Sequence, residues 1–194
     1  MPNLYLISGC NGAGKTTASL TVLPELLNCK EFVNADSIAS GLSPLNPDSV
    51  SFQAGKLMLE RINELKNLNV DFAIETTLTT LSYKNLILDC KKTGYEITIV
   101  FFWLKELSIA INRINDRVKK GGHFVDTEIV KRRYLKGIKN LFDIFIPISD
   151  NWFVYDNSDK YPVLVASGKG FEILRIFKKE IWEHLYIKIN GTKN

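Results

Sequence analysis

The chain has 194 residues, of which 45% are hydrophobic and 24% charged, and its formal net charge is +4. This balance is typical of a globular protein with a substantial core, and it excludes collagen-like, coiled-coil and disordered chains. The sequence has no run of about 18 uncharged apolar residues that could cross a bilayer. It also lacks the basic start of a signal peptide, so we expect a cytoplasmic protein without a membrane partner.

Cysteine and histidine are too few and too scattered for a structural cluster. Cys10, Cys29 and Cys90 show no paired spacing, and the histidines are His123 and His184. We therefore expect neither a disulfide framework nor a metal cluster.

Basic residues, in contrast, are concentrated in one segment. Residues 105–139 contain ten Lys or Arg and four Asp or Glu. Such a segment suits a nucleic acid, a membrane surface or a phosphorylated small molecule.

Apolar runs of strand type alternate with segments of helical period, which predicts an α/β protein with a mainly parallel sheet. In chain order, we expect strands at 4–8, 32–36, 70–75, 95–104, 152–156 and 163–166. The expected helices run from a Gly-rich turn to about residue 28, and then over 48–67, 82–93, 106–120, 127–145 and 171–189. No linker or repeat interrupts this order, so we interpret residues 1–194 as one domain.

The strongest motif matches G-x-x-x-x-G-K-[ST] and lies between the first expected strand and the first expected helix. Its glycines let the backbone approach phosphate oxygens, and the helix N-terminus attracts their charge. Lys15 can reach the β- and γ-phosphates, and the Thr16 hydroxyl can ligate Mg²⁺. We therefore predict a site for ATP and Mg²⁺ formed by Gly9, Cys10, Asn11, Gly12, Ala13, Gly14, Lys15, Thr16 and Thr17.

Two acids follow apolar strands, at the sheet edge where α/β proteins place their ligands. Asp36 ends the strand expected at 32–36, and it could alternatively cap the next helix. Glu75 ends the strand expected at 70–75 and is a poor N-cap, which favours a role toward magnesium, water or a substrate hydroxyl. Both acids are candidate catalytic residues.

The basic segment contains a diglycine break at residues 121–122 between two expected helices. This arrangement suits a lid, at about 113–133, that closes on the transferring phosphoryl group. A solvated cationic helix face is the alternative interpretation. The candidate arginines are Arg113, Arg117, Arg132 and Arg133. Further along, Asn157 and Ser158 are candidates for contact with the nucleotide base, and an ordinary turn would also explain them.

Together, these motifs resemble the zeta-toxin family of small P-loop kinases over residues 4–168. The resemblance rests on Gly-Cys-Asn-Gly-Ala-Gly-Lys-Thr (9–16), Val-Asn-Ala-Asp (33–36), Glu-Thr-Thr-Leu (75–78), Gly-Gly-His (121–123), Arg-Arg-Tyr (132–134) and Tyr-Asp-Asn-Ser (155–158). It implies a P-loop NTPase three-layer sandwich with a mainly parallel central sheet and a helical lid. Zeta toxins that bind an antitoxin usually carry additional residues before the P-loop strand. In this sequence, the P-loop strand is expected to begin at Leu4.

The resemblance also implies an activity. Zeta toxins phosphorylate the 3′-hydroxyl of the sugar in UDP-N-acetylglucosamine and are restrained by a small antitoxin protein. By resemblance, Asp36 activates the substrate hydroxyl, Glu75 helps to hold substrate, and Arg117 and Arg133 are the lid arginines. Alternative functions are an ATPase in which Glu75 positions water, and a nucleic-acid 5′-hydroxyl kinase that uses the basic segment. The latter normally has a larger net charge or aromatic stacking positions, so we expect no nucleic-acid partner.

Overall fold

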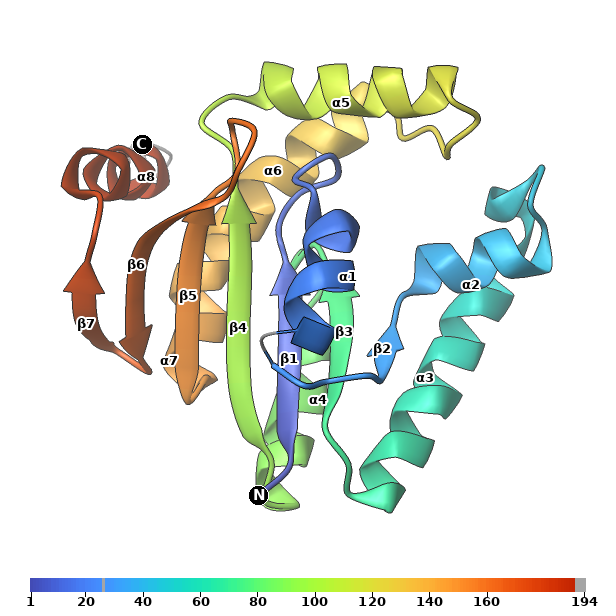
Figure 1. Ribbon diagram of the computed structural model, residues 1–194, viewed down its shortest axis with the longest axis horizontal. Helices are drawn as coiled ribbons and strands as arrows, with labels where there is room; N and C mark the ends of the chain where they lie inside the picture. The colour runs from blue at the N-terminus through green and yellow to red at the C-terminus, as the bar shows by residue number, and fades with distance from the viewer. Residues whose placement is uncertain (26, 191–194) are drawn as a thin grey trace.

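The computed structural model describes residues 1–25 and 27–190, and these residues contain seven strands in one sheet (Figure 1). The strand order is β2-β3-β1-β4-β5-β6-β7, with parallel pairing from β2 to β5 and antiparallel pairing of β6 and β7. The strands are β1 (Asn3–Ser8), β2 (Phe32–Val33), β3 (Phe72–Thr76), β4 (Glu96–Trp103), β5 (Asn151–Asp156), β6 (Val163–Lys169) and β7 (Glu172–Ile176). The prediction of a mainly parallel α/β fold is confirmed.

Helices lie on both sides of this sheet. In Figure 1, α1 lies in front of the central strands, α4, α6 and α7 lie behind them, and α5 crosses above their carboxyl ends. The helical elements are α1 (Lys15–Glu25), α2 (Ala35–Leu42), the 3-10 turn η1 (Pro47–Val50), α3 (Ser51–Leu68), α4 (Ser82–Lys92), α5 (Leu107–Lys119), α6 (Thr127–Asn140), the π-helical turn η2 (Leu141–Phe145), α7 (Ile146–Ile148) and α8 (Lys179–Asn190). None of the helices in the described ranges is long and apolar enough to cross a membrane.

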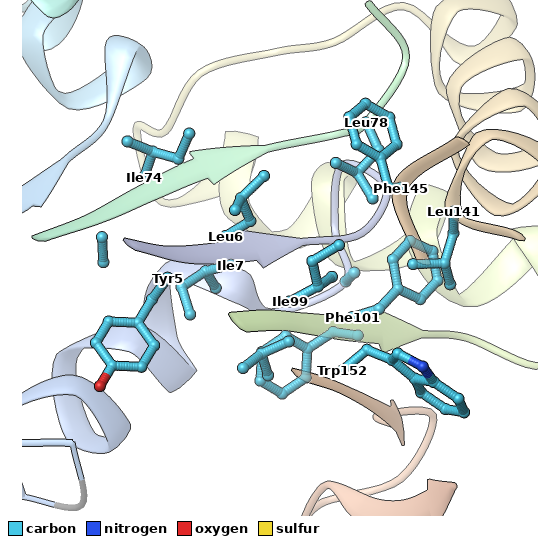
Figure 2. Packing of buried hydrophobic residues seen from close by; sticks show 14 of the residues in the cluster. Tyr5, Leu6, Ile7, Ile74, Leu78, Ile99, Phe101, Leu141, Phe145 and Trp152 are labelled. Atoms are coloured by element: carbon cyan, nitrogen blue, oxygen red, sulfur yellow. The ribbon is translucent and has the colours of Figure 1, made fainter. Parts of the chain in front are cut away.

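The hydrophobic core is built around the central strands (Figure 2). From Ile97 to Trp103, every residue of β4 is buried, because β1 and β5 flank the strand and both of its faces are covered. Such burial explains the long apolar run in the sequence. On one face, Phe101 and Trp152 pack toward Phe145, at the end of η2. This packed sheet fixes the carboxyl ends of β1, β3, β4 and β5 at one edge.

Two sequence expectations are wrong, and both errors arise where short strands meet turns. The helix expected at 171–189 begins only at Lys179, because Gly170 (φ +47°) turns the chain back so that Glu172–Ile176 pairs with β6. The strand expected at 32–36 ends at Val33, since α2 already begins at Ala35. Asp36 therefore lies in the first turn of a helix rather than at the end of a strand.

Candidate functional site

The predicted phosphate-binding loop connects β1 to α1, and its glycines adopt backbone conformations that other residues avoid. Gly12 has φ +78° and Gly14 has φ +82°, in the left-handed region. A Cβ atom at Gly12 would lie 2.6 Å from the carbonyl oxygen of Ala110, and one at Gly14 would lie 2.5 Å from Nδ2 of Asn157. Both positions therefore need glycine for its φ angle and for its lack of a side chain. The loop opens onto the positive N-terminus of α1, which suits an anion.

Asn157 holds this loop from the end of β5. Its side-chain Nδ2 donates a 2.7 Å hydrogen bond to the carbonyl oxygen of Ala13, which is fully buried. Its own backbone N–H donates to the carbonyl oxygen of Trp103 at the end of β4. The amide group of Asn157 therefore positions the P-loop backbone. A contact between Asn157 and the base, as the sequence suggests, stays a prediction.

The first lid arginine also contacts the segment after β5. Arg113 extends from α5, and its Nη2 donates 3.2 Å hydrogen bonds to the carbonyl oxygens of Ser158 and Asp159. Ser158 in turn donates its hydroxyl hydrogen to the Asp156 carboxylate and accepts a hydrogen bond from the backbone N–H of Lys105. Arg113 therefore ties α5 to the segment that holds the P-loop.

Glu75 joins the two P-loop residues that are expected to handle phosphate and metal. Its Oε1 lies 3.4 Å from Nζ of Lys15, and its Oε2 accepts 2.7 Å hydrogen bonds from the Thr16 hydroxyl and the Asn34 amide. Nζ of Lys15 also donates to the carbonyl oxygen of Cys10 at 2.9 Å. The side chains of Glu75 and Lys15 are only 11% and 6% exposed, so their attraction is weakly screened. A carboxylate, a hydroxyl and an ammonium group thus meet at the mouth of the loop.

The helix-cap interpretation of Asp36 is wrong, because Asn34 is the N-cap residue of α2. Oδ1 of Asn34 accepts hydrogen bonds from the backbone N–H groups of Asp36 and Ser37, at 2.8 and 3.2 Å. One amide side chain therefore caps the helix through its oxygen and holds Glu75 through its nitrogen. In the described part of the chain, the Asp36 carboxylate is exposed and has no hydrogen-bond partner of its own. Asp36 is available to a ligand.

A cavity of about 790 Å³ lies over the P-loop, and we call it the phosphate cavity. Of the predicted nucleotide site, residues 11, 12 and 14–17 line it, and the other predicted residues in its wall are Asp36, Glu75, Arg113 and Arg117. Gly9, Cys10 and Ala13 are buried in the described fold and do not line this cavity. Both predicted acids and two of the four predicted arginines therefore lie around the phosphate cavity.

A second cavity of about 200 Å³, which we call the side cavity, adjoins the phosphate cavity at Asp36 and Glu75. Arg133 lines it, and Nη1 of Arg133 donates a 3.0 Å hydrogen bond to Oδ1 of Asn11 in the P-loop. Arg117 instead lines the phosphate cavity, and its Nη2 donates to the carbonyl oxygen of His123 at 2.7 Å. The two arginines therefore serve different cavities. Arg132 is exposed on α6 and lines neither of them.

The segment between α5 and α6 also contacts η1, which connects α2 to α3, through His123. Its Nε2 lies 3.7 Å from Oδ1 of Asp48 in η1, a contact that becomes an ion pair when the imidazole is protonated. Gly121 (φ +81°) forms the turn between α5 and α6. The predicted diglycine break is thus the bend between the two helices of the expected lid.

The polar wall of the side cavity was not among the predicted site residues. Thr77, Thr79 and Thr80 line it with Tyr83, whose phenol comes from α4. Burial, with the nearby charges of Asp36 and Glu75, raises the pKa of Tyr83, so its hydroxyl stays protonated at neutral pH. Threonines directly after β3 were visible in the sequence, but the place of Tyr83 depends on how α4 packs. Asn34 could have been found from its position just before a helix.

Cys10 lies within the P-loop but is not a nucleophile. Burial raises the pKa of its thiol to about 11, and its side chain is 5% exposed. The thiol is therefore neutral at physiological pH and inaccessible. The contribution of Cys10 to the site is its carbonyl group, which accepts the hydrogen bond from Lys15.

Comparison with known proteins identifies similar sequences and folds. The sequence model described as "Zeta toxin" matches residues 1–160. An uncharacterized protein of Haemophilus influenzae is 29% identical over 126 residues, which cover 65% of this chain and 88% of that protein.

Two solved structures share the fold at low sequence identity. The AvrRxo1-ORF1:AvrRxo1-ORF2 complex, crystallised with ATP, aligns with a TM-score of 0.75 and 18% identity over 95% of this chain. This chain spans only 63% of that protein's length. A structure from the PezAT chromosomal toxin–antitoxin system of Streptococcus pneumoniae aligns with a TM-score of 0.64 and 19% identity, covering 100% of this chain and 88% of the other.

Proposed function

Because the chain belongs to the zeta-toxin family of ATP-dependent P-loop phosphotransferases, we propose that it transfers the γ-phosphate of ATP to a hydroxyl group of a nucleotide sugar such as UDP-N-acetylglucosamine. The observation that supports this proposal most directly is the position of Asp36. Its unpartnered carboxylate lies where the phosphate cavity and the side cavity meet. A phosphate donor in one cavity and a hydroxyl acceptor in the other would approach each other at this acid.

The residues present fit a magnesium ion. The Thr16 hydroxyl and the Glu75 carboxylate lie 2.7 Å apart at the P-loop, and both are the hard oxygen donors that Mg²⁺ prefers. Sites of this kind use one or two protein oxygens, with phosphate and water completing the shell. When bound there, Mg²⁺ would neutralise charge on the β- and γ-phosphate oxygens. We propose that Thr16 and Glu75 hold it.

In the proposed reaction, Lys15 exchanges its contacts with Glu75 and the Cys10 carbonyl for the β- and γ-phosphate oxygens. Asp36 accepts the proton of the acceptor hydroxyl, whose oxygen bonds to the γ-phosphorus as the bond from phosphorus to the β–γ bridging oxygen breaks. Arg117 stabilises the charge that develops in the phosphate cavity. Arg133 acts on the same developing charge from the side cavity, beside the acceptor.

A direct test is transfer of label from γ-labelled ATP, with Mg²⁺, to a panel of nucleotide sugars, nucleosides and oligonucleotides. We expect a nucleotide sugar to acquire the label, and Lys15→Ala to abolish transfer. Asp36→Asn should leave ATP affinity nearly unchanged and lower transfer at least 10²-fold, the usual range for a general base. Full transfer by Asp36→Asn would contradict the proposal. Labelling of an oligonucleotide instead would favour a nucleic-acid kinase.

The proposal extends to partner and location. Membership of this family supports a small antitoxin protein as partner, and we propose the cytoplasm, where ATP is abundant, as the site of the reaction. Co-purification of the chain with the product of a neighbouring reading frame would test the partner. Inhibition of label transfer by that protein would establish its role.

A further inference from the structure

Asn34 and Glu75 lie beside each other near the carboxyl ends of β2 and β3. The two strands pair in parallel, and the last pair in their register is Val33 with Ile74. The residues that follow this pair are Asn34 and Glu75, and Nδ2 of Asn34 donates a 2.7 Å hydrogen bond to Oε2 of Glu75. Only 6% of Asn34 is exposed, so water competes little with this contact.

The Glu75 carboxylate has two further polar partners in the described part of the chain, Lys15 and Thr16. Both have other tasks in the proposed reaction, because Lys15 turns to the phosphate oxygens and the Thr16 hydroxyl to the metal ion. Asn34 has no task toward the nucleotide in that reaction. It is therefore the partner that can keep its hydrogen bond to Glu75 once ATP is bound.

The oxygen of the same amide group holds the helix that carries Asp36. As the N-cap of α2, Oδ1 of Asn34 accepts hydrogen bonds from the backbone N–H groups of Asp36 and Ser37, at 2.8 and 3.2 Å. An amide supplies a donor and an acceptor at once, whereas a carboxylate has no donor and a serine hydroxyl is too short to reach both sides. One planar group thus ties the first turn of α2 to Glu75.

We propose that Asn34 is a positioning residue that keeps the carboxylates of Asp36 and Glu75 in a fixed arrangement during phosphoryl transfer. The inference rests on the proposed function, in which Asp36 accepts the proton and Glu75 holds Mg²⁺. Without Asn34, Glu75 would lose its remaining partner when ATP binds, and the N-terminus of α2 would lose its cap. Groups that hold a metal ligand in this way typically change metal affinity about 10–100-fold when they are removed.

Two substitutions at Asn34 separate its two contacts. Asn34→Ser keeps an N-cap residue of similar rank and removes the donor to Glu75. In calorimetric titrations it should weaken ATP binding about tenfold when Mg²⁺ is present, leave binding without Mg²⁺ unchanged, and keep kcat at saturating ATP and Mg²⁺. Asn34→Ala removes the cap as well, so it should also lower the urea midpoint of unfolding and reduce kcat by about tenfold or more, because Asp36 is then misplaced.

A double-mutant cycle tests whether Asn34 acts through the Glu75 carboxylate. In the Glu75→Ala background, Asn34→Ser should cause no further loss of affinity, since the effects of residues that act together are not additive. Asn151→Ser is the matched control, because Asn151 donates a hydrogen bond of the same length, 2.7 Å, to the Glu96 carboxylate at the other end of the sheet. This control should keep its affinity for ATP with and without Mg²⁺.

The outcomes distinguish this inference from the proposed function. If Asn34→Ser loses affinity equally with and without Mg²⁺, or loses none while Glu75→Ala does, the role of Asn34 is overturned and the kinase proposal stands. A tenfold loss added in the Glu75→Ala background would overturn the path through Glu75. If neither variant changes the affinity, the metal site and the role of Asn34 are both wrong. If the Mg²⁺-dependent loss occurs but no nucleotide sugar acquires label from ATP, the proposed acceptor is wrong and the role of Asn34 stands.

Discussion

Replacement of Asn157 by alanine separates two roles for this residue, holding the P-loop or contacting the base. The substitution removes the 2.7 Å hydrogen bond to the Ala13 carbonyl oxygen and leaves that oxygen buried without its partner. A neutral hydrogen bond contributes about 1 kcal/mol, and an unsatisfied buried group costs about 1–3 kcal/mol. We therefore expect the free energy of unfolding to fall by about 2 kcal/mol. A loosened Ala13–Gly14 backbone should also weaken ATP binding by about tenfold, which corresponds to about 1.4 kcal/mol.

Urea unfolding and calorimetric titration with ATP and GTP measure both quantities. Asn151→Ala is a matched control, because Asn151 lies at the other end of β5 and donates a hydrogen bond of the same length, 2.7 Å, to Glu96. This control should lose stability and keep its nucleotide affinity. If Asn157→Ala instead keeps its stability and changes only the preference between ATP and GTP, Asn157 contacts the base and the reasoning is refuted.

The remaining predictions concern the lid and the thiol. Arg117→Ala and Arg133→Ala should each lower kcat on the order of 10³-fold if they stabilise the transferring phosphoryl group; wild-type turnover in both variants would assign them to a solvated face. Burial raises the pKa of Cys10 from 9.0 to about 11, so the folded state retains this proton more tightly than the unfolded state. The resulting stabilisation is complete below pH 9 and is lost toward pH 11, by about 1.4 kcal/mol per pH unit. Urea unfolding at pH 8 and 10 should therefore show a larger loss for wild type than for Cys10→Ala, and equal losses would contradict the raised pKa.

The parts of the site that the sequence predicts are those set by local pattern and by strand direction. The P-loop is contiguous, and its place between a strand and a helix follows from hydrophobic periodicity. Glu75 belongs to a parallel strand beside β1, and Asp36 follows β2, so both arrive at the edge where β1 ends. The direction of the parallel strands alone therefore brings the two acids to the P-loop, although β2 is shorter than the strand expected from the sequence.

Other contacts depend on packing between distant segments, and no local pattern reveals them. Asn157 is 144 residues from Ala13, and Arg133 is 122 residues from Asn11. The mistaken helix at 171–177 has a different cause. Its apolar residues recur at spacings that fit either a helix or a strand, and pairing with β6 decides for a strand.

Asp36 and Glu75 lie at the same cavity but are held differently, and on this difference we propose separate tasks for them. Glu75 is fixed by Lys15, Thr16 and Asn34, so it is suited to holding the P-loop side chains and a metal ion rather than to moving a proton. Glu75→Gln keeps the shape of the side chain and removes its negative charge. We expect it to raise the Mg²⁺ concentration for half-maximal transfer at least tenfold, while slow hydrolysis of ATP by water persists at saturating Mg²⁺. In an ATPase that uses Glu75 to position water, Glu75→Gln would instead abolish hydrolysis at every Mg²⁺ concentration and Asp36→Asn would not. If Glu75 holds the divalent ion, removing the charge of its carboxylate removes part of the attraction for that ion. An unchanged Mg²⁺ concentration for half-maximal transfer would therefore exclude Glu75 from the metal site.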